Sequence, residues 1–316
     1  LGTVCVMTSL GLNPYINCQG FARMGMLTVL VGAVANIVLD PIFIFALGMG
    51  VSGAAVATVL SQLLSALWVL RFLTGPKAEL RLHFRAFRPD FGCIRRIAAL
   101  GTSSFVMSFT DSMVQMVCNA TLRTFGGDIY ISVMTVINSV RQIAQTPVMA
   151  ISDGASPAIS FNYGAHAYGR VRAAIRFMTQ LGFGYTLLIW ALVSAFPAAF
   201  IMIFNHDAEL VATAVPALHI YFFGFVMMAF QFSGQCVFKS LNRAGLAIFF
   251  SLLRKAFIVV PLTLLLPHVG GLGVNGVFLA EPISNCVGGL ACYLTMRRTV
   301  MPALRSRGQA GAQGIS

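Results

Sequence analysis

The chain alternates between long apolar runs and short polar connections. The nine apolar runs lie near 1–19, 25–46, 53–73, 97–122, 130–152, 175–203, 210–238, 246–267 and 274–296. A helix needs about 20 apolar residues to cross a bilayer. Strands of a membrane barrel instead alternate over about ten residues. We therefore predict an all-α integral membrane protein with nine transmembrane helices.

Basic residues gather in every second connection between these runs. They include Arg23, the stretch 71–96, the stretch 170–176, the pair at 239 and 243, and the stretch 297–307. Because basic loops stay in the cytoplasm, we predict a multi-pass protein of the plasma (inner) membrane with a cytoplasmic C-terminus. The net charge of +12 is thereby explained without nucleic acid.

A repeat relates the two ends of the sequence. Residues 48–61 and 271–284 share Gly, Gly, Val, Gly, Ala and Ser at equal positions. The last three runs therefore repeat the first three in the same orientation. Because six runs lie between 97 and 296, we expect six in the first half too, with three helices preceding Leu1. Two parallel six-helix repeats, twelve helices in all, are a transporter architecture.

The expected organisation has four parts. Residues 1–74 form the last three helices of an N-lobe, 75–96 a cytoplasmic linker, 97–300 a six-helix C-lobe, and 301–316 a cytoplasmic tail.

A polar pair interrupts the second run. Asn36 and Asp40 are four residues apart and share one helical face, and Pro41 opens the backbone ladder beside the acid. An acid inside a membrane span is costly and faces a cavity, an ion or a partner. We interpret Asp40 as an ion- or proton-coupling group. The alternative is a protonated carboxyl that bonds a neighbouring helix.

Polar stripes mark other runs. They comprise Thr58, Ser61, Gln62 and Ser65; Glu281, Ser284, Asn285 and Gly288; and Asn138, Arg141, Gln142 and Gln145. Asp111, Asp153, Arg254 and Lys255 add charges within apolar runs. These side chains indicate a polar or wet interior. The alternative for the stripes and for Asp111 is hydrogen bonding between helices. The alternative for Arg254 and Lys255 is snorkelling, and for Asp153 it is simple exposure near the cytoplasmic end of its run.

No motif indicates an enzyme. The glycines at 48–53 and 271–276 have dinucleotide-loop spacing, but each turn joins two apolar runs and lacks the acid about 20 residues later. The seven cysteines have no metal-binding spacing and are interpreted as small apolar side chains. We expect no resident cofactor.

Residues 11–25, 39–45, 48–55 and 157–165 together resemble the multidrug and toxic compound extrusion (MATE) family, in particular its MepA-like branch. The resemblance extends from Leu1 to about Arg298. It implies two pseudo-symmetric six-helix lobes of the MATE/MOP type and export of drugs driven by inward Na⁺ or H⁺.

The resemblance also implies site residues. The family's N-lobe cation site falls on Asn36, Asp40 and Thr58, with Na⁺ at Asp40 as the one conceivable metal. Its C-lobe acid falls on Asp111, whereas the run 210–238 has no acid and offers Gln231 and Gln235. This favours coupling through the N-lobe. Further C-lobe coupling or cavity candidates are Glu281, Arg141, Asn138, Gln142 and Arg254.

The resulting hypothesis is a monomeric, cation-coupled antiporter that expels lipophilic, often cationic drugs by alternating access and contacts membrane lipids. Its rival is a lipid-linked saccharide flippase of the same superfamily. Anionic cargo would favour a basic cavity, and Arg141, Arg254 and Lys255 keep this rival open. A membrane-embedded enzyme ranks third.

Overall fold

The computed structural model describes residues 2–82 and 90–313, which contain helices and no strand. The chain divides into two compact units, Leu1–Asp90 and Phe91–Ser316. Residues 83–89 of the predicted linker and 314–316 of the predicted tail lie outside the described residues.

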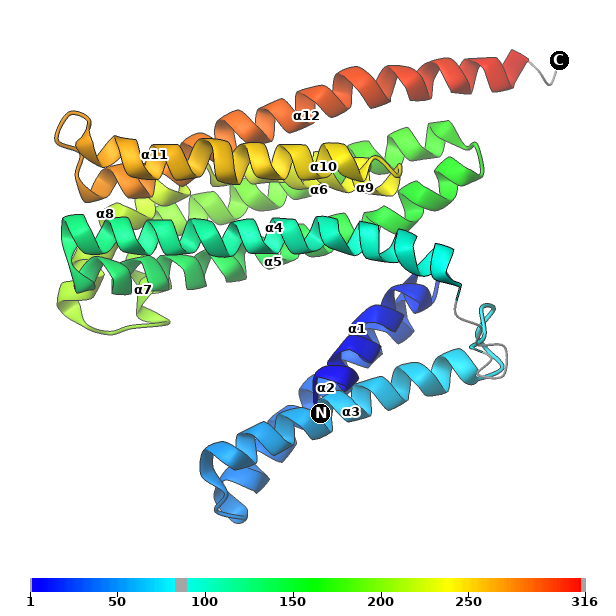
Figure 1. Ribbon diagram of the computed structural model, residues 1–316, viewed down its shortest axis with the longest axis horizontal. Helices are drawn as coiled ribbons and strands as arrows, with labels where there is room; N and C mark the ends of the chain where they lie inside the picture. The colour runs from blue at the N-terminus through cyan, green and yellow to red at the C-terminus, as the bar shows by residue number, and fades with distance from the viewer. Residues whose placement is uncertain (1, 83–89, 314–316) are drawn as a thin grey trace. The chain divides into compact units, whose positions relative to one another are not determined.

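The first unit is a set of three packed helical segments (Figure 1). They are α1 Gly2–Cys18, α2 Ala22–Pro41 continued by the π-helical turn η1 Ile42–Ala46, and α3 Gly50–Thr74. Both α1 and α2 pack against α3. The small core centres on Ile16, Val69 and Phe72, and the Ser65 hydroxyl donates to the Thr28 carbonyl at 3.1 Å.

The second unit contains the longer helices. They are α4 Phe91–Gly126, α5 Asp128–Gly164, α6 Tyr168–Ala195, α7 Pro197–Met202, α8 Ala208–Phe222, η3 Phe225–Met227, α9 Met228–Ser240, α10 Ala244–Leu252, η4 Leu253–Val259, α11 Val260–Leu265, η5 Leu266–His268 and α12 Val274–Gln313. Helix α4 thus begins within the range expected for the linker, and α12 continues through most of the range expected for the tail.

Two apolar cores hold this unit together. One contains Leu122, Ile137, Leu218 and Phe278, from α4, α5, α8 and α12. The other contains side chains of α5, α6, α9, α10 and α12, among them Phe238. Each of the helices α5, α9 and α12 contributes first to the first core and, further along the chain, to the second core. Between these two parts, each helix carries polar residues. This order leaves a polar band between two apolar ends.

The repeated glycine turns have the same geometry in both units. Gly48 and Gly50 in the first turn, and Gly271 and Gly273 in the second, have positive φ angles, which glycine adopts readily. The third glycine of each turn lies against the preceding helix. A Cβ atom there would come within 2.6 Å of the Phe43 carbonyl oxygen at Gly53, and within 2.7 Å of the Leu266 carbonyl carbon at Gly276.

The backbone departs from regular helix at two kinds of place. Helix α8 and the segment Phe225–Ser240 are bent by 42°. Gly224 lies at this bend, where a Cβ atom would be 2.5 Å from the Pro282 carbonyl oxygen. The π-helical turns η1 and η4 lie next to Pro41 and Pro261, each of which lacks the amide proton of a regular ladder.

Five helices of the described residues are long and apolar enough to cross a membrane, or six if the bent pair is one span. Three of the nine predicted spans, those near 1–19, 97–122 and 130–152, do not meet that measure. Helix α1 is too short, with 17 residues. Helices α4 and α5 are long enough, but their many polar residues lower their hydropathy.

Candidate functional site

The first candidate site is the Asn36–Asp40 pair of α2. The Asn36 amide donates a hydrogen bond to the Asp40 carboxylate (Nδ2 to Oδ1, 3.1 Å), and both residues are half-buried. A carboxylate has about four acceptor positions, so this bond leaves room for a proton or further donors. The pair lies directly before Pro41 and the π-helical turn η1.

Thr58 does not share a hydrogen bond with this pair in the described contacts. Its hydroxyl proton goes to the Ala54 carbonyl on its own helix, at 2.8 Å, and its side chain is exposed. The structure therefore joins two of the three residues predicted for the N-lobe site.

The second candidate site is a cavity of about 360 Å³ inside the second unit. Its wall is built by α4, α5, α8, α9, α10, η4 and α12. Part of the wall is apolar and flexible, with Met107, Met134, Met149 and Met228. The other part carries a cluster of five charges, hereafter the charge cluster: Asp111, Arg141, Arg254, Lys255 and Glu281.

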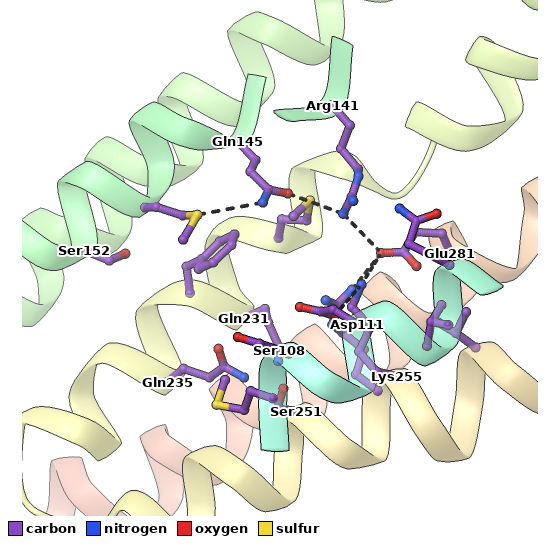
Figure 2. A pocket seen from close by; sticks show the side chains of 18 of the residues that line it. Ser108, Asp111, Arg141, Gln145, Ser152, Gln231, Gln235, Ser251, Lys255 and Glu281 are labelled. Atoms are coloured by element: carbon purple, nitrogen blue, oxygen red, sulfur yellow. Dashed lines mark hydrogen bonds and ion pairs between the residues drawn. The ribbon is translucent and has the colours of Figure 1, made fainter. Parts of the chain in front are cut away.

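Glu281 is the centre of the charge cluster (Figure 2). Its Oε1 atom lies 2.9 Å from Nη1 of Arg254, 3.5 Å from Nζ of Lys255 and 4.0 Å from Nη1 of Arg141. Lys255 also pairs with Asp111 (Nζ to Oδ1, 3.1 Å). The Glu281 side chain is 6% exposed. A buried acid beside three bases stays ionised, so Glu281 acts as a fixed negative charge.

The local fold explains how these charges meet. Arg254 and Lys255 are adjacent in sequence, and neighbouring residues of a regular α-helix point about 100° apart. They lie in the π-helical turn η4, where both reach Glu281. Such single π-helical turns are frequent at functional sites.

All four residues of the predicted stripe on α12 lie against Arg254. Besides the Glu281 contact, Asn285 accepts from Nη1 of Arg254 at 2.7 Å, and the Ser284 hydroxyl donates to the Arg254 carbonyl at 2.9 Å. At Gly288 a Cβ atom would lie 3.0 Å from Cγ of Arg254. The stripe thus forms the surface on which the Arg254 side chain packs.

The predicted stripe on α5 is divided. Asn138 donates to Gln115 at 3.3 Å, and Arg141 reaches Gln145 at 3.5 Å. Gln142 is exposed and lies outside the cavity wall.

Several buried polar atoms around the charge cluster have no protein partner within the described residues. They are both amide atoms of Gln231, Oδ1 of Asn138, and Nε of Arg141 and of Arg254. An unsatisfied buried polar group costs about 1–3 kcal/mol. Gln231 lines the cavity, so a ligand or water there could satisfy its amide.

Sequence reasoning missed Gln115 and Tyr221, both of which line the cavity. Gln115 has a sequence signal, because Asp111, Gln115 and Cys118 recur at i, i+4 and i+7 on α4. Tyr221 lies in a continuous apolar run and has no such signal.

A helical membrane protein with an acid–amide pair in one apolar helix and a charged interior cavity is typical of transporters. The MatE family matches residues 103–265, and the chain belongs to this family. It is 22% identical over 291 residues to the multidrug export protein MepA of Staphylococcus aureus, covering 91% of this chain and 63% of MepA. The chain thus spans under two thirds of that relative, an export protein rather than an enzyme.

Solved structures share the fold. A MATE protein crystallised in complex with MaL6 superposes with a TM-score of 0.89 at 23% identity, covering 96% of this chain and 68% of that one. An outward-facing multidrug resistance MATE family transporter of the MOP superfamily gives 0.84 at 24% identity, covering 92% and 65%.

Proposed function

We propose that this chain is part of a cation-coupled multidrug antiporter of the plasma (inner) membrane that exports lipophilic compounds by alternating access. The observation that carries the proposal is the hydrogen-bonded Asn36–Asp40 pair in an apolar helix beside Pro41. Membership of the MatE family and likeness to a multidrug export protein support it. The intact transporter would have twelve helices in two six-helix lobes, act as a monomer and place its C-terminus in the cytoplasm.

The proposed mechanism uses Asp40 as the exchangeable charge. A carboxylate changes its proton affinity when its surroundings alternate between wet and dry. Binding of H⁺ or Na⁺ at Asp40, with the Asn36 and Thr58 oxygens as further ligands for Na⁺, would favour one conformation. A ligand shifts a conformational equilibrium only by its differential affinity for the two states.

The test is dye accumulation in cells that express the protein, with ethidium as a lipophilic cation and fluorescein as a lipophilic anion. Wild-type cells should accumulate less of at least one dye than empty cells, and an ionophore should abolish the difference. Asp40→Asn should accumulate as much as empty cells despite equal expression. A protonophore and a sodium ionophore, used separately, identify the coupling ion.

The control is Asp128→Asn, which removes one negative charge from an exposed surface pair with Arg123. It should export as wild type does. Full, ionophore-sensitive export by Asp40→Asn would refute the proposed coupling.

The charge cluster favours a second candidate function, a flippase for lipid-linked saccharides. Three bases against two acids suit an anionic cargo. Under this alternative, wild-type protein in vesicles translocates a lipid-linked saccharide, and Arg141→Glu and Arg254→Glu abolish translocation. Wild-type vesicles without translocation would exclude it.

A further inference from the structure

We propose that the cavity of the second unit binds a small amphipathic organic anion, whose acidic group pairs with Lys255 in place of Asp111. The proposal names a cargo class for the transporter proposed above and rests on that function for its biological role. Binding itself can be tested without transport.

The first argument is the charge balance. The charge cluster has the bases Arg141, Arg254 and Lys255 and the acids Asp111 and Glu281. It therefore carries one excess positive charge. A monoanion neutralises this excess, whereas a lipophilic cation adds to it.

The second argument is the unequal exposure of the paired groups. The Lys255 side chain is 8% exposed, while that of Asp111 is 58% exposed. Glu281 is held by three bases, and Arg254 is further held by Asn285. Asp111 is thus the more exposed of the two acids and the one held by a single base, so it is the acid that a ligand can displace. Its departure leaves a buried ammonium facing the cavity.

The third argument is the set of uncommitted amides beside these charges. Gln231 is 3% exposed, lines the cavity, and has no partner for either amide atom among the described residues. Gln235 lies one turn further along α9 and also lines the cavity (Figure 2). Amide N–H groups can donate to a carboxylate or sulfonate held by Lys255.

The fourth argument is the apolar wall. Met107, Met149, Met228 and Phe232 line the same cavity. Methionine adapts to varied apolar shapes. A cavity of about 360 Å³ lies at the lower end of the range for small-molecule sites, about 300–1,000 Å³. It therefore suits an acidic group on a compact apolar body.

The experiment compares two fluorescent probes that share a dansyl group, anionic dansylglycine and cationic dansylcadaverine. The purified protein is placed in phosphatidylcholine nanodiscs, and probe binding is followed by dansyl fluorescence. Dansylglycine should bind at least about tenfold more tightly than dansylcadaverine, which corresponds to about 1.4 kcal/mol. Equal or tighter binding of dansylcadaverine would overturn the proposal.

The decisive variant is Asp111→Asn, because its expected effect is a gain. Removal of the competing acid should tighten dansylglycine binding by up to about fivefold, the upper end of the range for an exposed ion pair. Misfolding would expose apolar surface to both probes alike, so a gain for dansylglycine but not for dansylcadaverine reports the site. If Asp111 instead serves a cationic ligand or holds the fold, the variant will bind dansylglycine no better, and the proposal fails.

Two further variants locate the effect. Lys255→Met should weaken dansylglycine binding at least about tenfold by removing the proposed counterion. Asp128→Asn changes the net charge as Asp111→Asn does, but on the surface at the Arg123 pair, and should change nothing. Tightening by both Asp variants would refute a local site.

An anionic lipid headgroup offers the same chemistry as a free organic acid. Replacing part of the phosphatidylcholine with phosphatidylglycerol distinguishes the two sources. Unchanged dansylglycine affinity supports a small-molecule site, and strong competition assigns the cavity to lipid and overturns the proposal. Because these assays measure equilibrium binding, loss of coupling in Asp40→Asn would leave their outcome intact.

Discussion

The two units carry acids of opposite character in related helical frames. In the first unit, Asp40 accepts a hydrogen bond from Asn36, and no ion pair of the described residues includes it. In the second unit, Glu281 contacts three bases. An acid without a base can exchange a proton or a cation, whereas an acid beside three bases keeps its charge.

The repeat makes this contrast more specific. Thr58 and Glu281 occupy equivalent positions after the glycine turns, as do Ser61 and Ser284. In the second unit Glu281 lies on the helix after the turn, and two of the three bases that contact it, Arg254 and Lys255, lie on the segment before the turn. The first unit has its acid on the helix before the turn and a threonine after it. One frame therefore carries a hydrogen-bonded acid–amide pair in one unit and a cluster of paired charges in the other.

The largest expected effect follows from Glu281→Gln. Removing one partner of a buried ion pair typically costs about 3–5 kcal/mol, because the remaining charges stay buried without compensation. We expect a large drop in the unfolding temperature of the purified protein in detergent. Glu79→Gln, which changes an exposed acid, should stay within about 0.5 kcal/mol of wild type.

A double variant sharpens the Glu281 prediction. Adding Lys255→Met to Glu281→Gln removes one of the bases that lost its contact with Glu281 and should recover part of the lost stability. If Glu281→Gln alone melts as wild type does, Glu281 is not the centre of a stabilising cluster and the contrast with Asp40 fails.

The turn glycines give the next largest effect and should affect the two units alike. Gly53→Ala and Gly276→Ala each place a methyl group against the backbone of the preceding helix. Overpacking costs about 1–3 kcal/mol, which exceeds the roughly 1 kcal/mol that alanine gains over glycine in a helix. Both variants should melt at lower temperature.

The matched control for the turns is Gly101→Ala in α4, where a Cβ atom would meet nothing within 4 Å. It should keep or raise the unfolding temperature. Unequal effects of Gly53→Ala and Gly276→Ala would show that the two turns are not equivalent in packing.

Sequence reasoning succeeded where periodicity carried the information. The apolar runs predicted the helical elements, and the 3.6-residue period placed Glu281, Ser284, Asn285 and Gly288 on one face, the face that contacts Arg254. The nine-span count exceeds the five or six spans that the described helices support.

Other features depend on contacts distant in sequence and leave no local pattern. The bend at Gly224 lies inside one apolar run, and the Pro282 backbone of α12 lies close to it, at a distance that only glycine tolerates. The meeting of Arg254 and Lys255 at Glu281 needs a π-helical turn, which a regular helical period does not predict. Thr58 could be placed after its turn, but not its hydrogen bond to Ala54.

The smallest expected effect separates the equivalent serines of the two units. The Ser284 hydroxyl donates to the Arg254 carbonyl across two helices, at 2.9 Å, whereas the Ser61 hydroxyl donates within its own helix to Thr58, at 2.8 Å. Ser284→Ala leaves a carbonyl in a π-helical turn without this donor and should cost about 1 kcal/mol.

Ser61→Ala removes a hydroxyl that only duplicates a local helical bond, and alanine has the higher helix propensity, so the change should be near zero. Thermal unfolding of both variants, measured side by side, checks the difference. Equal losses would mean that the two serines brace their units in the same way. The two units would then gain the same stability from these serines. Their difference would lie in the charges that the helices carry.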